Sequence, residues 1–168
     1  WVPIAELARW HAETTERGMT YAANIEACCG GAPGESRAVD DEYTKRSPLS
    51  SLWRAHIVPM DINAGIHDGH GGELGGEGSV PVGHSIRAFN ELAKAAGYRK
   101  DMISEEAIAA IEHEEAVPDS LAPGSTEDEP LYGRKIHLRR QSGLARLTLF
   151  EGGHDIVYDA AFAFFAKF

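Results

Sequence analysis

Two segments of the chain end an apolar run and then place an ionisable side chain on a glycine-containing turn. The run over 147–150 is followed by Glu151, two glycines and His154, and the partly β-branched run over 57–66 leads to Asp68. A residue that directly follows a strand lies at the carboxyl edge of a sheet, where ligands and catalytic groups collect in open α/β proteins. An aspartate and a histidine at two such junctions suggest the carboxylate and the base of a hydrolytic triad.

The serine that such a triad needs has no visible counterpart. A hydrolase of this kind carries its nucleophile on a sharp strand-to-helix turn with the pattern Gly-x-Ser-x-Gly, and the sequence has no such pattern. Ser85 lies early in an expected helix without a glycine elbow, so we expect an ordinary serine at the surface or at the start of a helix. The nucleophile is therefore expected outside this chain, and the chain alone is expected to be inactive.

Hydrophobic periodicity predicts helices that alternate with strands. Residues 32–47 are polar and are expected to be irregular, with Tyr43 as their anchor. The alternation indicates an α/β protein with a parallel sheet, and a sheet of two or three strands needs cover from outside the chain. The expected elements are helices over 5–16, 21–28, 83–96, 104–114 and 156–168, a strand over 57–66 and a hairpin that ends with the strand at 147–150.

Three segments resemble the C-terminal half of α/β-hydrolases of the prolyl-oligopeptidase and acyl-esterase branch. They are Gly65-Ile66-His67-Asp68, Val80-Pro81-Val82 before a serine-bearing helix, and Glu151-Gly152-Gly153-His154. Residues 1–33 resemble the segment that follows the nucleophile-bearing half of those enzymes, so the likeness covers about three quarters of the chain. The chain departs from those enzymes in two ways: its loop over 68–80 is longer and richer in glycine, and the half that carries the nucleophile is absent.

The resemblance implies that residues 1–168 form the C-terminal part of one α/β-hydrolase domain, with its last parallel strands, flanking helices and an insertion at about 98–133. Asp68 and His154 would be the catalytic Asp and His. An N-terminal half with the nucleophilic Ser, either a separate chain or a missing segment, would complete the fold. The implied reaction is hydrolysis of a small-molecule ester through an acyl-enzyme, without a cofactor. The alternatives are a serine peptidase of the prolyl-oligopeptidase type and a non-catalytic half-domain used for binding or assembly.

Composition excludes two classes of partner. The net charge of −10 argues against nucleic acid, which is bound by clustered Lys and Arg. No apolar run approaches the ~20 residues that a membrane-spanning helix requires. The adjacent cysteines, Cys28 and Cys29, are expected to be free thiols, and the beginning at Trp1 is typical of a fragment, a processed chain or a partial sequence.

A metal site is an alternative interpretation of the loop after the first strand. His67, Asp68 and His70 could converge on Zn²⁺ with help from Glu73 or Glu77, although a polar active-site loop without metal is preferred.

The remaining ionisable residues are expected to have ordinary surface roles. Asp155 is expected to cap the closing helix. Arg139 and Arg140 are expected to be solvated, with substrate contact as the alternative, and the acidic runs in and after the helix over 104–114 are expected to form a solvated face. Three further histidines are expected to be exposed or interfacial: His84, His113 and His137.

Overall fold

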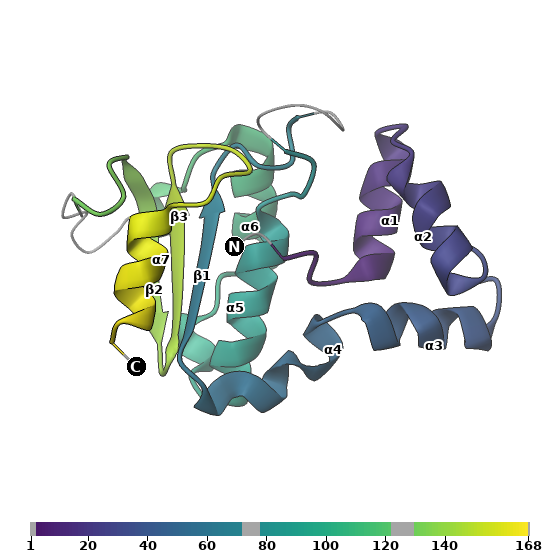
Figure 1. Cartoon of the computed structure of the whole chain (residues 1–168), viewed down its shortest axis with the longest axis horizontal. Helices are drawn as coiled ribbons and strands as arrows, with labels where there is room; N and C mark the ends of the chain where they lie inside the picture. The colour runs from purple at the N-terminus through teal and green to yellow at the C-terminus, as the bar shows by residue number, and fades with distance from the viewer. Residues whose placement is uncertain (1–2, 72–77, 122–129, 168) are drawn as a thin grey trace.

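A three-stranded mixed sheet organises the larger part of the molecule (Figure 1). The structure is a computed structural model that describes residues 3–71, 78–121 and 130–167. The strand order is β1-β3-β2, with β1 (Met60–Gly65) parallel to β3 (Ala145–Phe150) and β2 (Ile136–Ser142) antiparallel to β3. The predicted hairpin and the predicted parallel pair are both confirmed, but the sheet is mixed because the hairpin places β2 at its edge.

Helices α5 (Gly83–Ala95) and α6 (Glu105–Glu114) cover one face of this sheet. Side chains alternate along a strand, so every second residue of β1 and β3 points to this face. The predicted helices over 83–96 and 104–114 are confirmed. The core between these helices and the sheet includes Ile62, Ala64, Ile86, Phe89, Ile108, Ile111, Leu147 and Leu149.

Ion pairs as well as apolar contacts hold the acidic helix α6 against α5. The Arg87 guanidinium on α5 donates to Glu105 at 2.9 Å and to Glu112 at 3.3 Å. Ser104 begins the helix, because its hydroxyl accepts a hydrogen bond from the Ala107 N–H. The acidic residues are therefore solvated only in part, since Glu105 and Glu112 also form an interhelical contact.

The opposite face of the sheet is covered by α7 (Tyr158–Phe165). This helix is shorter than the predicted span of 156–168, of which residue 168 lies outside the described residues. Phe162 and Phe165 are 68% and 66% exposed, so much of the apolar side of α7 is left uncovered. The small core on this face consists of Tyr132, Ile136, Phe150, Val157 and Ala160.

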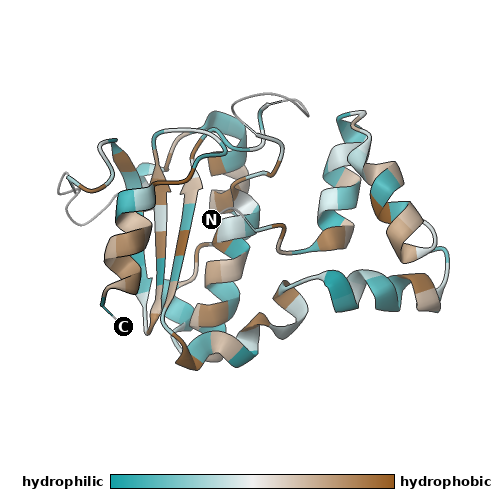
Figure 2. Ribbon diagram, viewed as in Figure 1, coloured by the Kyte–Doolittle hydropathy of each residue, from teal (hydrophilic) through white to brown (hydrophobic). Residues whose placement is uncertain are grey.

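Three helices form a second group beside the sheet: α1 (Leu7–Glu16), α2 (Tyr21–Cys29) and α3 (Arg37–Arg46). The predicted helices over 5–16 and 21–28 are confirmed. Helix α4 (Leu49–Leu52) and the 3-10 helix η1 (Trp53–Ile57) connect this group to the sheet. Figure 2 shows more hydrophilic residues along α1 and α3 than along the strands and α7.

Helix α3 contradicts the expectation that residues 32–47 are irregular. Its first turn is capped by the Ser36 hydroxyl, which accepts from the Val39 N–H. Glu42 pairs with Lys45 and Arg46 one turn later on the same face. Capping and local ion pairs thus stabilise a helix that has little apolar periodicity, while Tyr43 is 3% exposed and is the anchor that was predicted.

None of the described helices has both the length and the apolar character needed to cross a membrane.

Phe89→Ala should lower the free energy of unfolding by about 3–5 kcal/mol, because Phe89 is fully buried between α5 and the sheet. Urea unfolding followed by tryptophan fluorescence measures this change. The matched control, Phe162→Ala, removes the same atoms from a largely exposed position and should change stability by no more than about 0.5 kcal/mol. Equal effects of the two substitutions would contradict the packing described here.

Candidate active site

Asp68 and His154 lie together at one end of the sheet. They follow β1 and β3, whose carboxyl ends meet at the same edge because the two strands are parallel (Figure 1). The His154 Nδ1 atom is 2.9 Å from the Asp68 Oδ2 atom, although the residues are 86 positions apart in the chain. The structure therefore brings together the two side chains that the sequence singled out.

The backbone continues the strand pairing into both turns. The Ile66 N–H donates to the Phe150 carbonyl at 2.9 Å, and the His67 N–H donates to the Gly152 carbonyl at 3.0 Å. Gly65 allows this close approach, since a Cβ atom there would overlap with the carbonyl oxygens of Gly152 and Gly153. The distance between the two turns is thus set by main-chain contacts that only a glycine permits.

The two members of the pair differ sharply in exposure. The Asp68 side chain is fully buried, whereas the His154 side chain is 52% exposed. Burial raises the pKa of the Asp68 carboxyl, and His154 and the backbone N–H groups of Val80 and Gly69 oppose that rise. The buried carboxylate therefore depends on the imidazole beside it for compensation.

This arrangement defines what the imidazole can do. An ionised carboxylate only accepts hydrogen bonds, so the His154 Nδ1–H donates to Asp68, and in the neutral form of this imidazole Nε2 has a lone pair that can accept a proton. Nε2 has no hydrogen-bond partner within the described residues. An imidazole held in this way can take a proton from a hydroxyl group, and the carboxylate then stabilises the imidazolium.

The base of the glycine-rich loop packs directly on this pair. The Gly71 N–H donates to the Gly78 carbonyl at 2.8 Å and closes the loop. A Cβ atom at Gly78 would overlap with the Asp68 Oδ1 atom and with the His154 side chain. Gly78 has a φ of +76°, a conformation that glycine adopts without strain.

Arg17 is a residue that the sequence did not point to. From the end of α1, its guanidinium donates to the Ser79 carbonyl at 2.8 Å and to the Gly71 carbonyl. It thereby fixes both ends of the loop base that contacts Asp68 and His154. No local sequence signal could have identified it, because its partners are 62 and 54 positions away.

The metal interpretation gains no support from the described residues. No group of three or more potential ligands in residues 3–71, 78–121 and 130–167 is placed to hold a metal ion. His67 Nδ1 pairs with Glu115, and His70 Nδ1 is 3.8 Å from the same carboxylate. Glu73 and Glu77 lie outside the described residues.

Two polar residues expected near the surface are instead fully buried at the start of α5. The His84 Nδ1 atom accepts from the Ala5 N–H at 3.2 Å, and its Nε2 atom lies 2.9 Å from Glu13 on α1. His84 thus joins α5 to the N-terminal helices, and its expected exposure was wrong. Ser85 lies in the first helical turn, as expected, but is also buried rather than at the surface.

Several other expectations are corrected by contacts near the sheet. Asp155 does not cap α7; it pairs with Arg134 at 2.5 Å, and Val157 occupies the capping position. Arg139 and Arg140 are not simply solvated. The guanidinium carbon of Arg139 lies 5.0 Å from the centre of the Tyr132 ring, and the Arg140 guanidinium donates to the Asp101 carbonyl.

The other two histidines, on α6 and β2, differ in their exposure to solvent. His113 is exposed, as expected, whereas His137 is half-buried and pairs with Glu151 at 2.7 Å.

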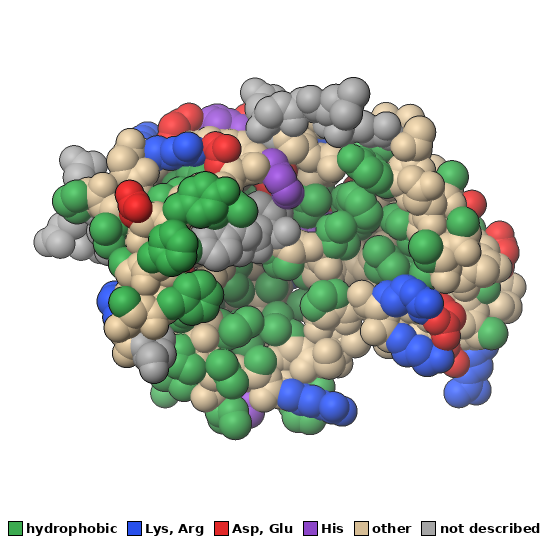
Figure 3. Space-filling model, viewed as in Figure 1, with side chains coloured by type: hydrophobic (Ala, Val, Ile, Leu, Met, Phe, Trp, Pro, Cys, Tyr) green, Lys and Arg blue, Asp and Glu red, His purple; other side chains and the backbone are tan. Residues whose placement is uncertain are grey.

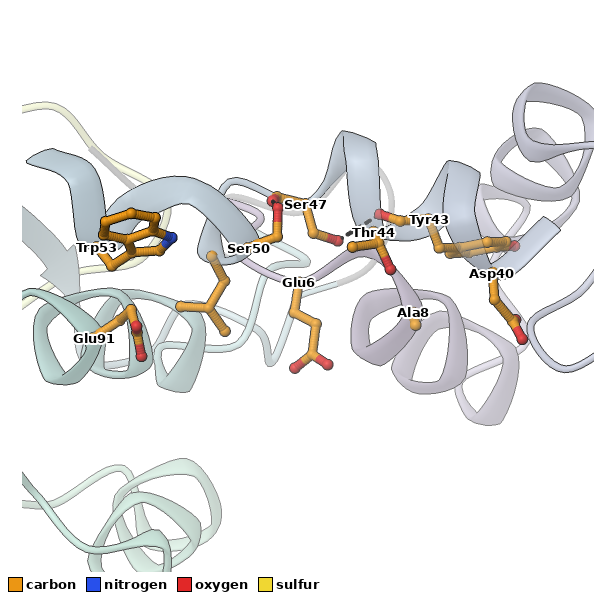
Figure 4. A pocket seen from close by; sticks show the side chains of 10 residues that line it. Glu6, Ala8, Asp40, Tyr43, Thr44, Ser47, Ser50, Trp53 and Glu91 are labelled. Atoms are coloured by element: carbon orange, nitrogen blue, oxygen red, sulfur yellow. Dashed lines mark hydrogen bonds between the residues drawn. The ribbon is translucent and has the colours of Figure 1, made fainter. Parts of the chain in front are cut away.

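A cavity of about 580 Å³ lies away from the Asp68–His154 pair, between α1, α3, α4 and α5 (Figure 4). It combines aromatic side chains with carboxylates, namely those of Tyr43, Trp53, Glu6, Asp40 and Glu91. Neither Asp68 nor His154 lines it, so this cavity is not where the pair would act.

Comparison with known proteins identifies no relative: no protein-family model matches the chain, and no curated protein or solved structure does either.

Gly78→Ala should weaken the Asp68–His154 hydrogen bond, because the added methyl group would occupy the space of both side chains. The measurement is the downfield proton resonance of the His154 Nδ1–H, together with the free energy of unfolding. Gly97→Ala is the matched control: its φ of +85° carries a similar left-handed strain, about 1–2 kcal/mol, but nothing lies within 4 Å of the new methyl group. A resonance that is unchanged in Gly78→Ala would show that the loop base does not support the pair.

Proposed function

We propose that this chain is the C-terminal part of an α/β-hydrolase domain and supplies the acid–base pair of a serine hydrolase. His154 is the general base, and Asp68 orients it and stabilises its charged form. One observation carries the proposal: a buried carboxylate holds an exposed imidazole by Nδ1, at the carboxyl ends of two parallel neighbouring strands. Catalytic groups collect at this edge in open α/β sheets.

The proposed reaction is acyl transfer to water in two halves. His154 Nε2 takes the proton from a serine hydroxyl while the serine oxygen attacks the carbonyl carbon of the substrate. The imidazolium then gives that proton to the leaving group, and an acyl-enzyme forms. In the second half, His154 takes a proton from water, the resulting oxygen attacks the acyl carbon, and the proton returns to the serine.

The nucleophilic serine and the donors that bind the oxyanion come, in this proposal, from an N-terminal half that is a separate chain or a missing segment. Within the described residues β1 pairs only with β3, so its other edge is free to accept a strand. Ile57 and Val58, just before β1, are 70% and 49% exposed.

Apolar surface continues from this edge towards α7. A groove of about 230 Å³ lies between the start of β1 and α7 and is lined by Met60, Ala161, Phe164 and Phe165. Figure 3 shows hydrophobic side chains gathered over α7 and across this region of the molecule. Because monomeric proteins rarely leave large contiguous apolar patches in water, this side is where the serine-bearing half would bind.

The preferred substrate is a small-molecule ester, with a peptide as the alternative. The acyl and leaving-group pockets belong largely to the serine-bearing half, so the preference rests on the resemblance of the two catalytic turns to the acyl-esterase and prolyl-oligopeptidase branch. A non-catalytic half-domain remains the alternative from a different class, and the presence of a reactive serine distinguishes the two.

His154→Ala should abolish ester turnover by the complete enzyme, and Asp68→Asn should reduce it less. In another triad, removal of the carboxylate lowered kcat by about 10⁴ and removal of the base by about 10⁶. The assay is hydrolysis of short acyl esters beside a prolyl peptide. The control is His113→Ala, which changes an exposed histidine on α6 and should leave turnover intact.

Two outcomes would change this assignment. Full ester turnover in His154→Ala would contradict the hydrolase, and cleavage of the peptide alone would make the enzyme a peptidase. A fluorophosphonate probe should label a serine of the other half and leave the buried Ser85 unlabelled. Absence of any labelled serine in the active particle would favour the non-catalytic half-domain.

A further inference from the structure

A second group of ionisable side chains links the two turns that carry Asp68 and His154. The Glu151 carboxylate lies 2.7 Å from His67 Nε2 through one oxygen and 2.7 Å from His137 Nε2 through the other. The opposite ring nitrogen of His67, Nδ1, contacts the Glu115 carboxylate. We call the Glu115–His67–Glu151–His137 series the histidine–glutamate bridge.

The protonation state of His67 follows from this geometry. A neutral imidazole has one nitrogen that donates and one that only accepts. Both nitrogens of His67 face carboxylate oxygens, which accept when ionised. Only the doubly protonated imidazolium satisfies both contacts, so the bridge is complete when His67 is charged. After deprotonation one ring lone pair would face a carboxylate and that contact would break.

The bridge is placed to control the geometry of the proposed catalytic pair. His67 directly precedes Asp68, and Glu151 lies on the turn that leads to His154. The remaining two members anchor the bridge to the scaffold, since His137 lies on β2 and Glu115 ends α6 with a φ of +51°. The same turns are joined by the backbone hydrogen bond from the His67 N–H to the Gly152 carbonyl.

We propose that Glu151 is a positioning residue for the Asp68–His154 pair and that it acts through His67 in its charged form. This inference rests on the proposed function of the pair. Glu151 does not touch the reacting atoms; it fixes the turn of His154 to the turn of Asp68. The bridge is complete while His67 is charged and opens as the pH rises and His67 loses its proton.

The contributions of His67 and Glu151 to stability depend on pH in opposite directions. Glu151, opposed by desolvation but assisted by Glu115, raises the pKa of His67. The contribution of His67 to stability is therefore fully present below its ordinary pKa, about 6.5, and is lost as the pH rises through its raised value. His67 and His137 lower the pKa of Glu151, so its contribution is present above the ordinary glutamate pKa and is lost as the pH falls through the lowered value.

Other charged groups face the bridge from the neighbouring elements. His70 lies 3.8 Å from Glu115, and Arg134, which pairs with Asp155, lies beside Gly152 next to Glu151. These contacts and the remaining carboxylate of Glu115 mean that loss of Glu151 should lower the pKa of His67 without abolishing its charge at acidic pH. Because the complete bridge needs a charged His67, turnover should fall as the pH rises through the titration of His67.

The first test is an NMR titration of the histidines in the 168-residue chain. Glu151→Gln keeps the shape of the side chain but removes its charge, and should lower the pKa of His67 more than Glu115→Gln does. Glu114→Gln, at an exposed position on α6, is the control and should leave that pKa unchanged. An equal or smaller effect of Glu151→Gln would overturn the proposal.

The second measurement is the hydrogen-exchange protection of the His67 N–H, which donates to Gly152. In the unsubstituted chain its protection should fall as His67 loses its proton, so the test does not depend on a variant that folds. Constant protection through that titration would overturn the proposal.

The third measurement is the pH profile of kcat/KM for the complete enzyme. Glu151→Gln should move the alkaline limb of this profile to lower pH, whereas a merely structural defect would lower the rate equally at every pH. An unmoved alkaline limb would contradict the positioning role. If no ester or peptide is hydrolysed but the His67 pKa and the exchange protection behave as stated, the proposed function fails while the bridge between the turns stands.

Discussion

The parallel pairing of β1 with β3 is the interaction on which the candidate site depends. It aligns Gly65 with Phe150 and sends both strands out of the sheet at the same edge. Gly65 then lets the backbone of the first turn contact the carbonyls of the second. A shift of this register would separate Asp68 from His154 even if both side chains kept their local conformations.

Burial gives the two members of the pair different properties. The Asp68 side chain is inaccessible to solvent, so its ionised form needs a hydrogen-bonding partner to offset the cost of burial. His154 is such a partner, while about half of its own side chain stays exposed to solvent. The surroundings come from distant parts of the chain: Arg17 on α1 holds the loop base, and Glu115 at the end of α6 reaches the turn after β1. The helices that surround the sheet therefore support the geometry of the pair as well as the stability of the core.

The sequence was a good guide to features with a local signal. The apolar run and the glycines before His154 predicted the strand and its turn, and the periodicity of Ile86 and Phe89 predicted α5. The pairing of Asp68 with His154 was predictable because each follows a strand in the order expected of a triad. Long-range polar contacts had no such signal. His84 resembles any polar residue at the start of a helix, and only the fold shows that it is buried and that Ala5 and Glu13 are its hydrogen-bond partners. Helix α3 was missed because capping and ion pairs, rather than apolar spacing, stabilise it.

We propose that His154 Nε2 receives the proton of a serine outside this chain. This is tested by a structure of the chain in complex with the proposed serine-bearing half after reaction with a fluorophosphonate. We expect a phosphonylated serine whose Oγ lies within about 2.6–3.2 Å of His154 Nε2, or slightly farther if the adduct displaces the ring. An adduct on a serine remote from His154, in a particle where the Asp68–His154 hydrogen bond is intact, would contradict it.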